Sequence, residues 1–183
     1  MSTVLVPLAA GCEELEAVTI IDLLRRADIE VVTAGLTDGP VKASRGTVVV
    51  PDTTLDAALQ RDYDMIVLPG GLPGADHLEN DKRVIKRIQQ MAADGKYVCA
   101  ICAAPKVLAT AGVLDGKRAT SYPGVLDKMG LADVTYTGSA VEIDGKVVTS
   151  RGPGTAMDFA LQLIELLAGS GRRKTVEKAL VRS

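Results

Sequence analysis

The chain has 183 residues, of which 47% are apolar and 24% charged, and its formal net charge is −2. This composition is ordinary for a globular protein, and the length is enough for one domain with a substantial hydrophobic core. A nearly neutral chain without a basic-aromatic stripe is a poor candidate for nucleic-acid binding. No apolar run approaches the roughly 18 residues of a membrane span, and the N-terminus lacks the basic region of a signal peptide. We therefore expect a cytoplasmic protein without membrane contact.

The first half of the chain alternates short apolar, β-branched runs with helical patterns. The apolar positions Leu15, Val18, Ile21 (or Ile20) and Leu24 lie about three apart and predict the buried face of a helix. The predicted elements are strands at 3–8, 29–36 and 63–71, helices at 13–27 and 80–95, a hairpin around Gly46, and a short helix within 53–59 capped by Thr53 or Thr54.

The second half continues the alternation and then becomes richer in strands. The predicted elements are a strand at 97–101, a helix at 104–112, a strand and turn at 117–124, two or three strands within 133–150 with a turn at Asp144-Gly145, a helix at 152–169 that ends at Gly169, and a last short helix at 174–181. Apolar strands separated by helices predict a mostly parallel sheet covered on both faces. The expected fold class is α/β, a flavodoxin-like three-layer α/β/α sandwich, in a single domain over residues 1–183.

The three cysteines show neither the number nor the spacing of a disulfide framework or a zinc site. Cys99 and Cys102 have dithiol spacing, but Cys99 lies inside a predicted strand. Cys102 follows that strand at the turn into a helix and is flanked by small residues, as in the nucleophile elbow of hydrolases. The start of the next helix favours a thiolate there. Cys102 is thus a candidate nucleophile, with a buried structural cysteine as the alternative, and Cys12 is expected to be accessible in a loop.

A glycine-rich turn follows the strand predicted at 63–71. Gly70, Gly71 and Gly74 match neither the dinucleotide fingerprint nor the P-loop. Glycines let backbone N–H groups approach a reacting atom, so the turn is a candidate oxyanion hole; a turn that serves only the fold is the alternative. In open α/β sheets, ligands bind beyond the carboxyl ends of the strands, where this turn and Cys102 both lie.

Three carboxylates open the helix predicted at 13–27. Glu14 is interpreted as a helix-capping acid, since the helix dipole favours acids at this end. Glu13 and Glu16 lie on neighbouring faces, so at least one can turn inward. An inward carboxyl beside a thiolate would have a raised pKa, because burial and the like charge both disfavour ionisation. It would stay protonated and donate a hydrogen bond to sulfur.

Four separated segments, GCEELEAVTIIDLLRRADIEVVTAG, DMIVLPGGLPGADHL, AICAAPKVLA and TSRGPGTAMDFALQLIELL, resemble the ThiJ/PfpI family over residues 3–180. Within it, they are most similar to the Parkinson's-disease-linked deglycase branch and its bacterial relatives. The resemblance implies a single class I glutamine amidotransferase-like domain that forms a homodimer. It implies that Cys102 is the nucleophile and Glu16 its protonated partner, and that the site's backbone donors come from Gly70, Gly71 and Ala103.

The resemblance also implies that Glu13 faces the pocket, and that Ser44 and Arg45 reach the dimer interface beside the partner's site. Two departures stand out. Ala103 replaces the histidine that follows the nucleophile in protease-like members, so peptidase activity is not expected. Tyr122 stands where many members of the deglycase branch have histidine, and a tyrosine is a poor proton shuttle at neutral pH. The single histidine, His77, is expected to have a surface or packing role.

The resemblance implies an enzyme without cofactor or metal that acts on reactive carbonyl compounds. The expected reactions are glyoxalase-type conversion of methylglyoxal and deglycation of its protein or nucleotide adducts, with protection against oxidative stress as the consequence. The alternative is a redox sensor or redox-regulated chaperone that signals through oxidation of Cys102.

Overall fold

The computed structural model describes residues 1–182; Ser183, the last residue of the predicted domain, lies outside them. A seven-stranded sheet has the order β10-β11-β7-β6-β1-β2-β5 and is parallel except for β10, which forms a hairpin with β11. Its strands are β1 Thr3–Leu8, β2 Glu30–Gly35, β5 Thr53–Thr54, β6 Met65–Leu68, β7 Tyr97–Ile101, β10 Val141–Asp144 and β11 Val147–Ser150. Two small ribbons lie outside it: β3 Val41–Lys42 with β4 Val48–Val49, and β8 Arg118–Ala119 with β9 Thr135–Tyr136.

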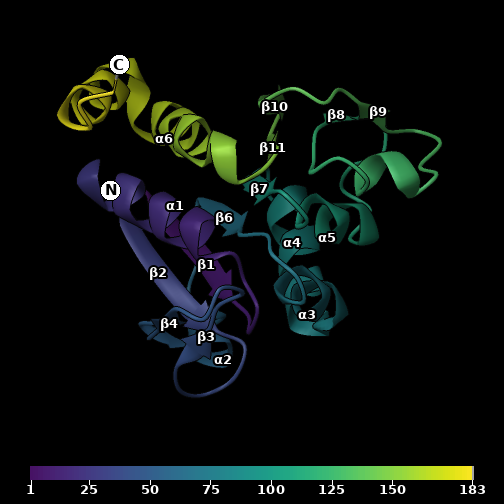
Figure 1. Cartoon of the computed structure of the whole chain (residues 1–183), viewed down its shortest axis with the longest axis horizontal. Coiled ribbons are helices and arrows are strands. Elements are labelled where there is room, and N and C mark those ends of the chain that lie inside the picture. Colours follow the sequence, from purple (N-terminus) through teal and green to yellow (C-terminus); the bar gives the residue numbers. More distant parts are fainter. Residues whose placement is uncertain (183) are drawn as a thin grey trace.

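Helices cover both faces of the sheet, as the alternating pattern predicts (Figure 1). The helices of one face are α1 Glu14–Arg26 and α6 Ala156–Ala179, and those of the other are α2 Leu55–Ala58, α3 Gly74–Asn80, α4 Lys82–Ala93 and α5 Pro105–Thr110. This arrangement is the predicted flavodoxin-like three-layer sandwich. Among residues 1–182, no helix combines the length and apolar character that a membrane crossing needs.

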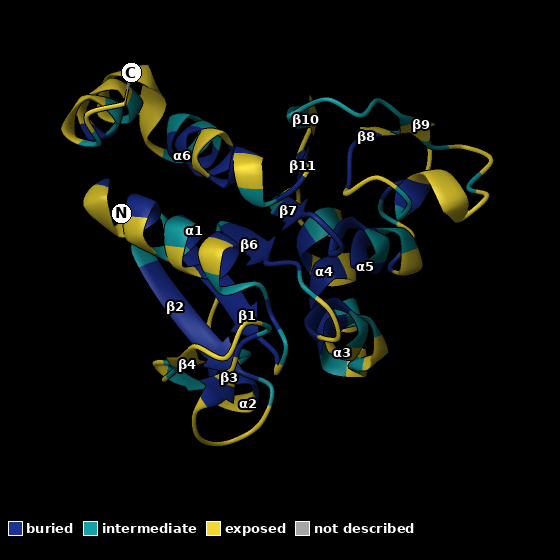
Figure 2. Ribbon diagram, viewed as in Figure 1, coloured by how far each residue is buried: buried dark blue, intermediate teal, exposed yellow. Residues whose placement is uncertain are grey.

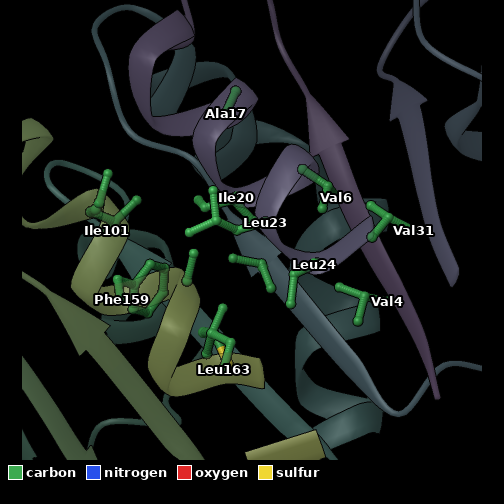
Figure 3. Packing of buried hydrophobic residues seen from close by; sticks show 14 of the residues in the cluster. Val4, Val6, Ala17, Ile20, Leu23, Leu24, Val31, Ile101, Phe159 and Leu163 are labelled. Atoms are coloured by element: carbon green, nitrogen blue, oxygen red, sulfur yellow. The ribbon is translucent and has the colours of Figure 1, made fainter. Parts of the chain in front are cut away.

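The core consists of two hydrophobic layers, one on each face of the sheet. In β1, Val4, Val6 and Leu8 face α1 and α6, whereas Leu5 faces the opposite helices, because successive strand side chains point to opposite faces. The central strands β1, β6 and β7 are buried except for the first residues of β1 and β7, Thr3 and Tyr97, which are half-buried (Figure 2). Figure 3 shows side chains of α1 and α6, among them Ile20 and Phe159, gathered over the sheet.

The predicted buried face of α1 is wrong at two of its positions. Leu15 and Val18 are 51% and 48% exposed, whereas Ala17, Ile20 and Leu24 are buried. The helix therefore points a neighbouring stripe at the sheet. Steps of three or four residues from Glu16 and Ala17 through Ile20 to Leu24 define that stripe.

Most of the predicted boundaries agree with the structure within a few residues. The strand predicted at 63–71 is shorter, Met65–Leu68, because the chain then turns so that Gly70 O accepts a hydrogen bond from Glu13 N at 2.9 Å. The helix predicted at 152–169 begins with a 3₁₀ turn at Pro153–Thr155. Gly169 adopts a φ of 84° and interrupts α6 at the predicted end.

Candidate active site

Cys102 lies on a strained turn at the carboxyl end of β7. Its φ is 64°, a left-handed conformation that few non-glycine residues adopt. The backbone is held from two sides: Cys102 N donates to Ser150 O at 3.0 Å, and Cys102 O accepts from Tyr122 N at 2.8 Å. A strained backbone persists only where its surroundings determine it, and such positions cluster at functional sites. The side chain is 9% exposed, so it touches solvent at the rim of the sheet.

Glu16 points inward from the first turn of α1 and is fully buried. Its Oε2 accepts a hydrogen bond from Gly70 N at 2.8 Å, while its Oε1 has no partner with hydrogen-bond geometry among residues 1–182. A Cβ at residue 70 would lie 2.7 Å from Cys102 Cβ and 2.8 Å from Glu16 Oε2. The missing side chain of Gly70 thus lets the carboxyl and the cysteine approach each other. Its N–H serves the carboxyl, so it is not free to bind a substrate oxyanion.

The two side chains influence each other's ionisation. Burial raises the pKa of Glu16 to about 7, and hydrogen bonds from Cys102 and Gly70 only partly oppose that rise. Burial also raises the pKa of the Cys102 thiol to about 12, and an ionised Glu16 beside it adds to the rise. Groups coupled in this way titrate as a pair. When the proton lies on Glu16, the carboxyl no longer repels a thiolate but can donate a hydrogen bond to it.

Two backbone N–H groups, those of Gly71 and Ala103, face the Cys102 sulfur and lower its pKa. Gly71 has a φ of 88°, and a Cβ there would lie 2.4 Å from Glu13 N. Its conformation and its close neighbours therefore both require glycine. The pair of amides has the form of an oxyanion hole, made by Gly71 and Ala103 without Gly70.

Glu13 and Glu14 bind the loop after β3 instead of entering the site. Glu13 caps α1 by accepting from Leu15 N at 3.2 Å, and its other oxygen accepts from Ser44 Oγ at 3.2 Å. Glu14 accepts from Ser44 Oγ at 3.1 Å and from Arg45 N at 3.0 Å. Although partial desolvation opposes it, hydrogen bonding lowers the pKa of Glu14 to about 2. The expected pocket role of Glu13 thus stays a prediction. The interpretation of Glu14 as the capping acid is wrong, because Glu13 caps the helix and Glu14, the first helical residue, turns to the loop.

Tyr122 is 52% exposed and lies against Gly152 at the edge of the site. It lines a cavity of about 400 Å³ together with Pro123 and Arg151–Thr155. The 151–155 loop, which lies beside Tyr122, was not singled out from the sequence. Ser150 Oγ and Thr155 Oγ1 lie 2.7 Å apart, and Gly152 N donates to Thr155 Oγ1 at 3.1 Å. The sequence signal for this loop is the Gly-Pro-Gly run at 152–154, which closely follows strand β11.

The other cysteines and His77 lie outside this arrangement. Cys12, expected to be accessible, is 1% exposed, because the 70–74 turn packs over its backbone. Cys99 is fully buried, and all three cysteines are unpaired. His77 is exposed on α3, with Nδ1 2.9 Å from Ala10 O. Within residues 1–182, no group of three or more His, Cys, Asp or Glu side chains is arranged to hold a metal ion.

The fold and the site define an α/β sandwich with a cysteine on a left-handed strand-to-helix turn, a buried carboxyl beside it and two backbone amides facing its sulfur. The chain belongs to the DJ-1/PfpI family, whose sequence model matches residues 2–166. The resemblance seen in the sequence is thereby confirmed.

Relatives match almost the whole chain. "Protein DJ-1 homolog A" of Arabidopsis thaliana is 43% identical over 181 residues, which are 98% of this chain and 46% of the relative. The chain therefore spans less than half the length of that relative, and 41% of the second Arabidopsis homologue. "Glutathione-independent glyoxalase DJR-1.2" of Caenorhabditis elegans is 35% identical over 168 residues, 92% of this chain and 89% of the relative.

Solved structures agree with the fold. The crystal structure of Drosophila melanogaster DJ-1beta is 42% identical and matches with a TM-score of 0.95 over 100% of both chains. That of oxidized Toxoplasma gondii DJ-1 is 39% identical, with the same TM-score and coverage.

Proposed function

We propose that this chain is a cysteine-dependent, cofactor-free enzyme that converts methylglyoxal, free or bound as an adduct to an amine or thiol, into lactate. The observation that carries the proposal is the buried Glu16 carboxyl beside Cys102, with the N–H groups of Gly71 and Ala103 facing the sulfur. The Caenorhabditis relative named as a glutathione-independent glyoxalase supports this choice of substrate.

The reaction begins when the Cys102 thiolate attacks the aldehyde carbon and forms a hemithioacetal. The N–H groups of Gly71 and Ala103 stabilise the oxyanion, which then takes the proton of Glu16. The Glu16 carboxylate next removes the hydrogen of the former aldehyde carbon as a proton, which leaves an enediolate, and returns this proton to the neighbouring carbon. The hydroxyl proton of the first carbon passes to the oxygen of the second, which becomes the alcohol, and the first carbon regains its C=O bond. The first carbon is thereby oxidised to a thioester and the second reduced. Water releases lactate and the thiol, so the sum is methylglyoxal plus water to lactate.

Tyr122 has a minor place in this chemistry. Its hydroxyl can donate a hydrogen bond to a substrate oxygen, but it does not exchange protons readily at neutral pH. Proton transfer is therefore assigned to Glu16 alone.

The test is lactate formation from methylglyoxal by the reduced wild type and by Cys102→Ser. We expect the variant to lose at least about a hundredfold in kcat/KM, because a serine hydroxyl beside Glu16 is a far weaker nucleophile than a thiolate. Cys12→Ala, which changes a buried cysteine outside the pair, is the matched control and keeps the activity. Equal turnover by wild type and Cys102→Ser would refute the proposal.

A second candidate function is redox sensing or redox-regulated chaperoning through Cys102. The favouring observation is exposure: Cys102 is 9% exposed, whereas Cys12 and Cys99 are 1% and 0% exposed. Oxidation to sulfinate would place an anion against Glu16 and the two amides. Mass spectrometry after graded peroxide, with turnover measured in parallel, decides between the two. Selective addition of two oxygens at Cys102 in a protein with negligible turnover favours the sensor, and holdase activity that survives in Cys102→Ser favours a chaperone.

We also propose that the protein works as a homodimer in the cytoplasm. Leu15 and Val18 on α1, and Val48 and Val50 beside the Ser44–Arg45 loop, are large apolar residues exposed in the single chain, and such patches mark interaction surfaces. Glu14 joins the two regions through its hydrogen bonds to the loop. The three free cysteines suit a reducing compartment.

A further inference from the structure

A second groove opens beside the site; residues 124–125 line it, whereas residues 122–123 line the cavity described above. The groove encloses about 420 Å³ and starts at Leu72 and Ala103, which adjoin the two amides that face the Cys102 sulfur. Pockets of this size hold ligands as large as drugs, from about 300 Å³ upward. Methylglyoxal has too few atoms to fill it. The groove is therefore suited to a larger molecule to which the three-carbon unit is attached as an adduct.

The floor and walls of the groove are apolar near the nucleophile. Leu72 is 60% exposed and Met129 38% exposed, and Val125 also lines the groove. Exposed apolar side chains inside a concave site gain free energy when a ligand covers them. An unbranched aliphatic stem matches this part of the groove.

The lining of the groove also carries charges of both signs. Lys106 Nζ forms ion pairs with Asp76 and, at 3.2 Å, with Glu79, so the wall made by α3 and α5 has one net negative charge. Lys128 lines the groove and lies against Gly124, with Nζ 3.5 Å from the position of a Cβ there. Lys128 forms no ion pair within residues 1–182. A surplus negative charge and an unpaired cation thus face the same space.

We propose that this groove is a carrier subsite that binds the zwitterionic head of a free amino acid whose distal amine bears the reacting three-carbon unit. Asp76 and Glu79 bind the α-ammonium group, Lys128 binds the α-carboxylate, and Leu72 and Met129 pack against the methylene stem. This rests on the proposed function, and it narrows the substrate class to adducts of free, lysine-like amino acids over adducts on protein chains. In a protein the same head is two neutral peptide groups, which leave these charges unmatched.

The test uses two stable amide probes and measures binding, not turnover. One probe is Nε-lactoyl-lysine with a free α-ammonium and α-carboxylate; the other is its Nα-acetyl methylamide, in which both charges are removed. Isothermal titration calorimetry with the reduced wild type is expected to show at least about tenfold tighter binding of the free form, and that preference shrinks as salt is raised.

Two variants locate the preference. In Lys128→Gln and in Glu79→Gln the ratio of the two dissociation constants is expected to fall to about threefold or less. Lys86→Gln, which changes an exposed lysine on α4 outside the groove lining, keeps the wild-type ratio. Because Glu79 pairs with Lys106, the folding of Glu79→Gln is checked by thermal melting. If Glu79→Gln is unfolded, the result for Lys128→Gln, a change at an exposed residue, decides the test.

Equal binding of the two probes to wild type, or an unchanged ratio in Lys128→Gln, overturns the subsite. The outcome is separate from the proposed function, because binding is also measured in Cys102→Ser, which is expected to have no turnover. Selective binding without methylglyoxal turnover in wild type would retain the subsite and reject the enzyme. Turnover of methylglyoxal without selective binding of the free probe would retain the enzyme and reject the subsite.

Discussion

At the scale of single residues, the site depends on which oxygen of Glu16 carries the proton. Oε2 accepts a hydrogen bond from the N–H of Gly70, so the proton of a neutral Glu16 is expected on Oε1, which has no hydrogen-bond partner among residues 1–182. A glutamine at this position would keep the same pattern, with its oxygen accepting from Gly70 and its NH₂ group in the place of the protonated oxygen. It imitates the protonated carboxyl but can neither give up a proton nor accept one.

Glu16→Gln and Glu16→Leu therefore separate thiolate stabilisation from proton transfer. At pH 7 we expect Glu16→Gln to alkylate with iodoacetamide at least about tenfold faster than Glu16→Leu, since a hydrogen bond to a charged group contributes about 1.5–3 kcal/mol. Both variants should lose lactate formation by about a hundredfold or more, the usual contribution of a positioned acid-base group. Equal alkylation rates, or a Glu16→Gln variant with wild-type turnover, would contradict these roles.

The sequence predicted these residues only in part. The elbow pattern pointed to Cys102, and helical rotation reduced the inward carboxyl to Glu13 or Glu16. Choosing between the two required the position of the sheet, which turns Glu16 inward and leaves Glu13 on the capping side. The partners of Glu14 lie 31 and 33 residues away in the sequence. Local sequence patterns do not identify hydrogen-bond partners at such separations.

At the scale of elements, the 70–74 turn and the 11–13 loop hold the amides in place. The backbone atoms of Gly11, Cys12 and Glu13 lie within 2.8 Å of a Cβ placed on Gly71. Backbone atoms of a packed loop yield less readily than the end of a flexible side chain. The turn is thus specified by its contacts as well as by its positive φ.

Gly71→Ala and Gly39→Ala compare these two effects. Both glycines have a φ of 88°, but a Cβ on Gly39 meets nothing within 4 Å. Gly39→Ala is expected to destabilise by about 1–2 kcal/mol, the penalty of a left-handed alanine. Gly71→Ala should cost at least about 2 kcal/mol more, because overpacking adds to strain. Urea unfolding measures the free energy of unfolding of both variants. Equal losses would contradict the tight packing of the 11–13 loop against residue 71.

Element types could be predicted from periodicity, but the buried side of α1 could not. Leu15 and Val18 have the spacing of a core stripe and are nevertheless exposed in the single chain. An apolar stripe facing a partner protein and one facing the protein's own sheet look alike in sequence. The glycine stop at Gly169, in contrast, was predictable because it depends on local conformation alone.

At the scale of the whole molecule, exposed Leu15 and Val18 predict self-association. Leu15→Glu combined with Val18→Glu should convert a dimer to a monomer in sedimentation-velocity runs, since two carboxylates buried against each partner would be unpaired. Ile143→Glu, at an exposed position on the edge strand β10, is the matched control and leaves the dimer intact. A wild type that sediments as a monomer at every concentration would remove this part of the proposal.

The central claim is that a neutral Glu16 holds the Cys102 sulfur as a reactive anion. It is tested most directly by the carboxyl bond lengths of Glu16 in an atomic-resolution crystal structure of the reduced protein near pH 6, below the raised pKa of about 7. We predict two unequal C–O bonds, the longer one to Oε1, the oxygen that does not accept from Gly70 N. Two equal bonds, as in a carboxylate, would contradict the account.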